Sequence, residues 1–269
     1  MSRKHKSTRQ VSRRSRRTMR RTRLDLSKRQ WQIIVGVALC LLFGLIVYQP
    51  IVDYFWGPAQ LARTYEAHVA PNVIRENVER QKTVGIVEPD TDVLQPETID
   101  VLDGVFDYEG ISLTMTLDIN PTIDREHIIG QIAIPDVDLQ LPILYGVTQD
   151  ILSVGAGTLK QEQVMGRGNY ALISHNSRNP DVLFAPLHRV DVGHRVYLTD
   201  HESIYIYEVS HVSVIPPEDV SVIADRGYAM VTLITCTPDG KERLLVQGNL
   251  VDAMIYDDAD VELLNMFVY

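Results

Sequence analysis

One cysteine and one arginine near the C-terminal end of the chain are spaced so that a tight hairpin would bring them together. Cys236 ends the apolar run 231–235, and Arg243 opens a second apolar run after a turn that contains Pro238 and Gly240. Proline fixes φ and glycine accepts positive φ, so the segment predicts a strand, a turn and a strand. Opposed Cβ atoms in an antiparallel pair lie about 5 Å apart. The guanidinium would then favour the thiolate form of the cysteine and donate hydrogen bonds to a developing oxyanion.

A thiol enzyme also needs a group that moves protons, and histidine suits this task near neutral pH. The chain has eight histidines. His175 differs from the others because it follows the apolar run 169–174 and precedes the polar Asn176. We therefore expect Cys236 to be a nucleophile and His175 to be the group that transfers its protons. From the spacing of Cys236 and Arg243 alone, a buried structural cysteine is an equally good interpretation, because free cysteines are often buried.

Charge is distributed very unevenly along the 269 residues. Residues 1–30 hold 13 of the 26 Lys and Arg side chains and one of the 35 acidic ones, so the remainder carries a net charge of −21. Residues 30–52 carry no charge, and Trp31 and Tyr48 lie near the two ends of this apolar stretch. About 20 apolar residues span a bilayer, and the positive-inside rule places the basic side in the cytoplasm. We expect a single transmembrane signal anchor in the cell membrane, with the acidic part outside.

Two alternatives compete with this interpretation of the N-terminus. A signal peptide cut near Ala62 would also begin with basic residues, but its apolar core usually has only about 7–15 residues. The arginines could also bind nucleic acid. We favour a topology signal and expect no nucleic-acid partner. Cys40 lies within the apolar stretch, which leaves Cys236 without a disulfide partner outside, and no cysteine cluster indicates a metal site.

The rest of the chain divides by pattern into helical, linking and β-rich parts. Residues 60–82 have helical periodicity, which Pro71 should kink or divide. Residues 88–109 hold eight acids and no Lys or Arg, and predict an extended linker. From about residue 128 the short β-rich runs predict a closed barrel or a sandwich. The expected strands are 130–134, 140–145, 169–174, 195–198, 203–215, 230–235 and 244–251, and the expected helical turns are 149–154, 183–190 and 217–223.

The residues around Cys236 and His175 resemble the motifs of the sortase family of cysteine transpeptidases. Thr-Leu-Ile-Thr-Cys at 232–236 is similar to the TLxTC signature, and Ser-His-Asn at 174–176 resembles the segment of the catalytic histidine. Arg243 matches the catalytic arginine of the family. The similarity covers roughly 128–251 and includes further runs at 168–172, 183–187 and 196–200. It resembles class A most, because Phe106-Asp107-Tyr108 lacks the proline of the class C lid motif and the C-terminal segment is polar.

The resemblance implies a mainly β fold, an eight-stranded barrel with short helices, preceded by the N-terminal transmembrane helix. It implies Cys236, His175 and Arg243 as catalytic residues, and we expect Ile173, Ser174, Ile234 and Thr235 to line the substrate site. In the family, the cysteine cleaves an LPXTG-like sorting signal between Thr and Gly. A peptidoglycan amine, in housekeeping members that of lipid II, then receives the surface protein in the Gram-positive cell wall. The expected partners are therefore LPXTG-bearing proteins, this amine and the membrane.

The expected parts of the chain follow from these interpretations. They are a basic cytoplasmic tail at 1–29, the anchor at 30–52, a membrane-proximal helix and acidic linker at 53–110, the catalytic domain at 111–254, and an acidic C-terminal tail at 255–269.

Three other functions compete with a housekeeping transpeptidase. A class C-type pilin polymerase would use a Lys acceptor, and a non-catalytic membrane-tethered binding module would keep the barrel. Retention of Cys236, His175 and Arg243 together argues against the binding module. A papain-like protease would place its cysteine before its histidine, the reverse of the order here. We expect no cofactor, although some class A members are activated by calcium, and four acids offer oxygen ligands: Glu162, Glu218, Asp219 and Asp225.

Overall fold

The computed structural model describes residues 27–84 and 123–269. The chain divides into two compact units, Met1–Tyr48 and Gln49–Tyr269. The basic tail predicted at 1–29 lies almost wholly outside the described residues, and the acidic linker predicted at 88–109 lies wholly outside them.

Two helices precede the β-rich part. Helix α1 comprises Lys28–His68, and α2 comprises Pro71–Val84, so the predicted division at Pro71 is confirmed. Proline suits the first position of a helix, where a backbone N–H would have no intrahelical partner. The anchor predicted at 30–52 falls within α1. Among the described residues, however, no helix combines the length and apolar character that a membrane crossing requires.

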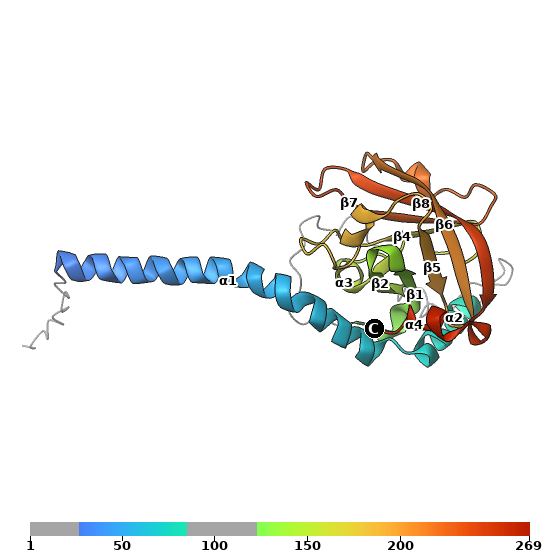
Figure 1. The fold of residues 1–269 in the computed structure, drawn as a ribbon, viewed down its shortest axis with the longest axis horizontal. Coiled ribbons are helices and arrows are strands. Elements are labelled where there is room, and N and C mark those ends of the chain that lie inside the picture. The colour runs from blue at the N-terminus through green and yellow to red at the C-terminus, as the bar shows by residue number, and fades with distance from the viewer. Residues whose placement is uncertain (1–26, 85–122) are drawn as a thin grey trace, which may run out of the picture. The chain divides into compact units, whose positions relative to one another are not determined.

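Eight strands close into a barrel in the order β1-β2-β3-β4-β7-β8-β6-β5, which confirms the expected architecture (Figure 1). The strands are β1 Ile128–Ile134, β2 Leu139–Leu144, β3 Ala156–Thr158, β4 Asn169–Ile173, β5 Arg195–Thr199, β6 Ser203–Ile215, β7 Met230–Cys236 and β8 Arg243–Ile255. Short helices connect or follow them: η1 Arg125–His127, η2 Pro135–Val137, α3 Gln149–Val154, η3 Ala185–Arg189, η4 Val220–Ile223, η5 Tyr256–Asp258 and α4 Val261–Asn265.

Strands β1 and β7 are apolar along nearly their whole length because both of their faces are covered. Every residue of β1 is buried, and so are the first six residues of β7. Val231 and Leu233 belong to the core inside the barrel, whereas Ile234 packs outside it against Val222 of η4. Strands buried on two faces lack the alternation that marks half-exposed ones. The η4 turn is thus fixed on the outer face of the strand that ends in Cys236.

Helix α2, which lies within the predicted part 53–110, packs against the barrel. Ile74 is fully buried, and Leu61 and Tyr65 at the end of α1 are also buried. The side-chain nitrogen of Asn77 donates to the carbonyl oxygens of Arg125 at 2.6 Å and Ile128 at 2.8 Å. An amphipathic helix buries its apolar face wherever a matching surface exists. The acidic composition of residues 88–109 gives no indication that the helix before them packs on the barrel.

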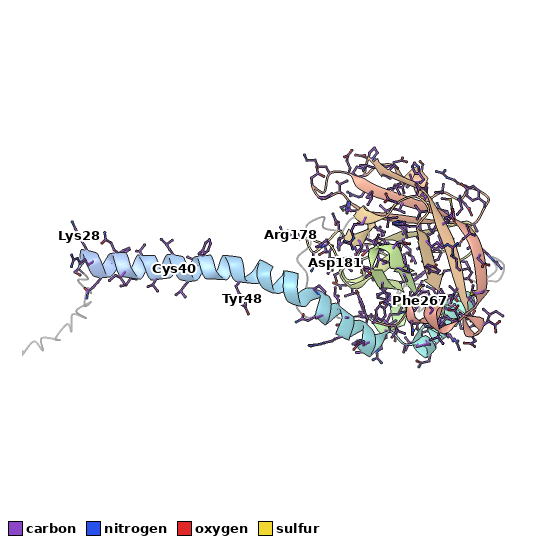
Figure 2. The ribbon with its side chains drawn as sticks, viewed as in Figure 1. Lys28, Cys40, Tyr48, Arg178, Asp181 and Phe267 are labelled. Atoms are coloured by element: carbon purple, nitrogen blue, oxygen red, sulfur yellow. The ribbon has the colours of Figure 1, made fainter. Side chains whose placement is uncertain are left out.

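Residues 255–269, predicted as an acidic C-terminal tail, also pack against the barrel. Strand β8 continues to Ile255, and η5 and α4 follow. Phe267, labelled in Figure 2, is buried against a cluster that includes Tyr197 and Ile204 on the barrel. The Gln131 side chain donates to the Phe267 carbonyl at 2.9 Å. The burial of Phe267 and this hydrogen bond hold the C-terminal segment on the barrel in spite of its acidic composition.

Ile74→Ala should lower the free energy of unfolding by roughly 2–5 kcal/mol, the usual cost of a buried Ile-to-Ala change. The reason is the cavity that the lost side chain leaves between α2 and the barrel. Urea unfolding of the full chain, monitored by far-UV circular dichroism, measures this loss of stability. Glu76→Ala on the exposed face of the same helix is the matched control, since its ion pair with Arg80 is exposed and worth little. Equal effects of the two substitutions would show that α2 does not belong to the folded barrel.

Candidate active site

The three predicted catalytic residues lie at neighbouring ends of the three adjacent strands β4, β7 and β8. β4 runs parallel to β7, with Ile173 opposite Ile234, and β7 runs antiparallel to β8, with Cys236 opposite Arg243. His175 follows Ile173 by two positions, as Cys236 follows Ile234. Because neighbouring strands lie about 4.8 Å apart, the continued register places His175 on one side of Cys236 and Arg243 on the other.

The hairpin between Cys236 and Arg243 is held by its own polar side chains. Gly240 has φ +73, as the turn signal predicted. The Thr237 hydroxyl donates to the Asp239 carboxylate at 2.7 Å and accepts from the Glu242 amide at 3.1 Å. The hydrogen bonds that Asp239 accepts from the Thr237 hydroxyl and the Lys241 backbone N–H lower the pKa of its carboxyl group. The loop therefore fixes the strand ends on which the thiol and the guanidinium lie.

Ser174 and Thr235 join the ends of β4 and β7 through hydrogen bonds of their hydroxyl groups. Both are buried, with 2% and 0% exposure. The Thr235 hydroxyl donates to the Ser174 carbonyl at 2.9 Å, and the Ser174 hydroxyl donates to the Gly155 carbonyl at 2.6 Å. Two of the four residues expected to line the substrate site therefore use their hydroxyl groups to hold the backbone next to the predicted catalytic residues. Ser174 directly precedes His175, and Thr235 directly precedes Cys236.

His175 is held in the barrel wall and is kept neutral by burial. Its exposure is 4%, and its carbonyl accepts from the Phe184 amide at 3.1 Å. An isolated bridge between Asn176 and Leu183 closes the following loop. Burial lowers the pKa of His175 from 6.5 to about 4. At neutral pH the imidazole is therefore uncharged, with one nitrogen protonated and the other available as an acceptor.

The Cys236 thiol is also in its neutral form at rest. It is partly exposed, and its burial raises the pKa while the charge of Arg243 lowers it, burial being the larger effect. Arg243 thus lowers the pKa of Cys236, as predicted, but by less than burial raises it. With a neutral thiol beside a neutral imidazole, formation of the thiolate requires transfer of a proton to His175 or another base.

The Arg243 guanidinium is directed at the carbonyl groups of its own loop. Nη1 donates to the Glu242 carbonyl at 3.1 Å and lies 3.5 Å from the Gly240 carbonyl. Among the ion pairs of the described residues, none includes Arg243. A guanidinium has five N–H donors in a planar fork. Donors therefore remain for an oxyanion that develops beside Cys236.

Sequence reasoning missed two polar side chains at this site. Nε2 of His188 on η3 lies 3.3 Å from the Cys236 carbonyl oxygen. The amide nitrogen of Gln149 on α3 lies 3.2 Å from Nε2 of His175. They are 48 and 26 positions from their partners along the chain. No local spacing signal exists for either contact.

Ile173 and Ile234 lie on the outer face of the sheet, where η4 covers part of it. They form an apolar cluster with Val222, Leu245 and their neighbours. A buried polar network fixes η4 on this face. The Asn169 amide donates to the Val222 carbonyl at 2.9 Å, and the Thr232 hydroxyl donates to the Asn169 side-chain oxygen at 2.7 Å. The Gln247 amide donates to the Thr232 hydroxyl at 3.1 Å and to the Val222 carbonyl at 3.2 Å.

The four acids considered for calcium are not brought together as a set. Within residues 27–84 and 123–269, no three His, Cys, Asp or Glu side chains gather closely enough to hold a metal ion. Asp219 instead caps η4, and its carboxylate accepts from the Ser221 amide at 3.2 Å and the Ser221 hydroxyl at 2.6 Å.

Comparison with known proteins gives one consistent family. The sortase domain model matches residues 132–251. The chain is 32% identical to sortase A of Bacillus anthracis over 228 residues, which cover 84% of this chain and 97% of that protein. It is 38% identical to sortase A of Streptococcus agalactiae, over 60% of this chain and 70% of the relative. The solved sortase A of Listeria monocytogenes has 36% identity and a TM-score of 0.50, and the match covers 53% of this chain and 97% of that one.

Proposed function

The chain belongs to the sortase family, and from this premise we propose the reaction that its Cys236 centre performs. The protein is a cysteine transpeptidase that anchors surface proteins by cleaving a sorting signal and joining it to a new amine. The observation that carries the assignment to this site is the register of three strands, which places Cys236 between His175 and Arg243.

In the first half of the reaction, Cys236 attacks the carbonyl carbon of the Thr in an LPXTG-like signal. The thiol proton passes to His175 as the C–S bond forms, and the Thr–Gly C–N bond then breaks. The Gly amine leaves with that proton, so His175 returns to its neutral form. The buried neutral imidazole suits the role of base at the start of this half, since its pKa of about 4 leaves it unprotonated at neutral pH.

In the second half, a cell-wall amine attacks the thioester and transfers a proton to His175. The C–S bond breaks, the Cys236 sulfur takes the proton, and an amide bond joins the surface protein to the acceptor. Both halves pass through a tetrahedral oxyanion, which the Arg243 guanidinium would stabilise through directed N–H donors. The amine of lipid II is the acceptor that the housekeeping relatives suggest.

Ile173, which is half-buried, would contact the sorting signal beside Cys236. Ile234 is buried on the same outer face under η4 and would support this apolar wall. Ser174 and Thr235 would support this wall from behind through their backbone hydrogen bonds.

The N-terminal segment would hold the enzyme at the membrane where lipid II is found. Residues 30–52 carry no charge and follow the basic residues 1–29, the arrangement typical of an anchor with a cytoplasmic N-terminus. Apolar side chains of α1 such as Trp31, Leu41 and Phe43 are more than half exposed. A bilayer would bury this surface.

The reaction is tested with the full chain, an LPXTG peptide and triglycine, followed by mass spectrometry. A thioester adduct on Cys236 and a peptide–triglycine product are expected. A peptide that offers only a Lys side-chain amine is the second acceptor, and preferential transfer to it would favour a pilin polymerase. Cleavage without transfer at any amine concentration would identify a protease, and absence of the adduct would refute the proposal.

His175→Ala should reduce transpeptidation by at least about 10²-fold, the low end for loss of a group that transfers protons. The matched control is His188→Ala, which removes the exposed imidazole that contacts the Cys236 carbonyl. Its effect should be only a few-fold, since a single hydrogen bond of this kind contributes about 1 kcal/mol. Initial rates of peptide–triglycine formation measure both. If His188→Ala is the severe substitution and His175→Ala the mild one, the proton-transfer role belongs to His188.

A further inference from the structure

Gln149 contacts the ring of His175 from a separate element of the fold. Its side-chain nitrogen lies 3.2 Å from Nε2 of His175. The helix that carries it, α3, is fixed at its start by Thr148, whose hydroxyl accepts from the Ile151 amide at 3.2 Å. Ile151 and Leu152 bury the other face of α3 in the barrel core. Gln149 is therefore held in place by its helix, and its contact with His175 is not that of a mobile surface chain.

The contact is compatible with one tautomer of the neutral His175 ring. The amide nitrogen of Gln149 faces Nε2, and a donor there pairs with a ring whose proton lies on Nδ1. When the ring gains a proton, both nitrogens become donors. The Gln149 amide then has to turn so that its oxygen faces Nε2. Glutamine can satisfy both states of the ring, whereas glutamate suits only the charged state and methionine suits neither.

We propose that Gln149 is a positioning residue that holds His175 through Nε2 and leaves Nδ1 to exchange protons with Cys236, the leaving amine and the incoming amine. The inference rests on the proposed function, because it assigns the transferred proton to one nitrogen of His175. Gln149 acts by keeping one ring orientation and one tautomer of His175 through both halves of the reaction.

Two ionisable groups follow His175 across the strand ends: Cys236 at the end of β7 and, one strand further, Arg243 at the start of β8. His188 on η3 contacts the Cys236 carbonyl, and Asp150 follows Gln149 on α3. Burial is nevertheless the cause of the low pKa of His175. A hydrogen bond that Gln149 donates to the neutral ring acts in the same direction, because it stabilises the uncharged form.

The test uses the full chain labelled with ¹⁵N histidine, and NMR reports the tautomer and the titration of His175. The signals of the eight histidines are assigned by comparison with His175→Gln. The variants are Gln149→Met, which keeps the length and removes the hydrogen bond, and Gln149→Glu, which accepts only. Asp150→Asn, an exposed change one position along α3, is the matched control.

The wild-type ring is expected as the Nδ1–H tautomer, and Gln149→Met should give a mixture of tautomers. Its kcat should fall about 5- to 10-fold, the effect of one lost hydrogen bond, with KM within about twofold. Gln149→Glu should raise the pKa of His175 by about one unit or more, because a carboxylate stabilises the imidazolium. Asp150→Asn should leave the tautomer unchanged.

An Nε2–H tautomer in the wild type, or unchanged tautomer and titration in both Gln149 variants, would overturn the proposal. A rise in KM with no change in the ring would make Gln149 a substrate contact instead. Should Gln149→Met fail to fold, Gln149→Glu still gives the titration shift. The NMR measurements need no substrate, so failure of the transpeptidase assignment and failure of this inference give different results.

Discussion

Cys236→Ala is expected to abolish both cleavage of the sorting signal and transfer to the amine, a loss on the order of 10⁴-fold or more, as for removal of other enzymic nucleophiles. No other group at the site can form the thioester, since the chain has one further cysteine, Cys40. Cys40 lies on α1 in the other compact unit (Figure 2). The covalent intermediate should therefore be absent as well as the product.

Mass spectrometry of the protein and of the peptide products measures both losses. Cys40→Ala is the matched control and should behave as the wild type. The Cys236 side chain is partly exposed, so its truncation should leave the barrel folded, which a thermal melt checks. Transfer of the peptide to triglycine by the folded Cys236→Ala protein would show that another residue is the nucleophile.

Arg243→Lys should reduce transpeptidation by roughly 10²–10³-fold, the cost of losing one oxyanion donor. Two roles are open to Arg243, since its charge lowers the pKa of Cys236 and its N–H groups can bind an oxyanion. Lysine preserves the charge but lacks the planar fork of donors. If charge were the main contribution, Arg243→Lys would keep most of the activity. We expect the donors to matter more, because they must lie about 3 Å from the developing charge.

Two measurements on the same variant separate these roles. The first is the transpeptidation rate, and the second is the pH dependence of Cys236 alkylation by a small reagent, which should barely move. Lys241→Ala removes an exposed charge from the same hairpin and is the matched control for both. A large upward shift of the alkylation profile in Arg243→Lys, or near-full transpeptidation, would contradict the oxyanion role.

The local features of the site could be predicted from the sequence because they depend on neighbouring residues. The Cys236–Arg243 pairing follows from a six-residue turn, and β6 was predicted with its observed bounds, Ser203–Ile215. Strand β3 was missed because Ala156–Thr158 is only three residues long and contains a glycine. Such a strand exists because β2 and β4 flank it, and no pattern within it predicts it.

The features that could not be predicted depend on residues far apart in the chain. Asn77 bonds to carbonyl groups 48 and 51 positions away, and Gln131 to one that is 136 positions away. These contacts place α2 and the C-terminal segment on the barrel, where the sequence predicted only a membrane-proximal helix and an acidic tail. The positions of Gln149 and His188 beside the site depend likewise on closure of the barrel.

The parallel pairing of β4 and β7 has a consequence for the order in which the site forms during folding. The bond from Thr235 to Ser174 joins residues 61 positions apart, and the bond from Thr232 to Asn169 joins residues 63 positions apart. Hairpins form in about 1–10 μs, whereas contacts of high sequence separation form slowly because a long loop must first close. A newly made chain therefore brings Cys236 beside Arg243 well before His175 arrives. During this interval Cys236 lacks the histidine that would take its proton, so the complete site exists only once β4 has paired with β7.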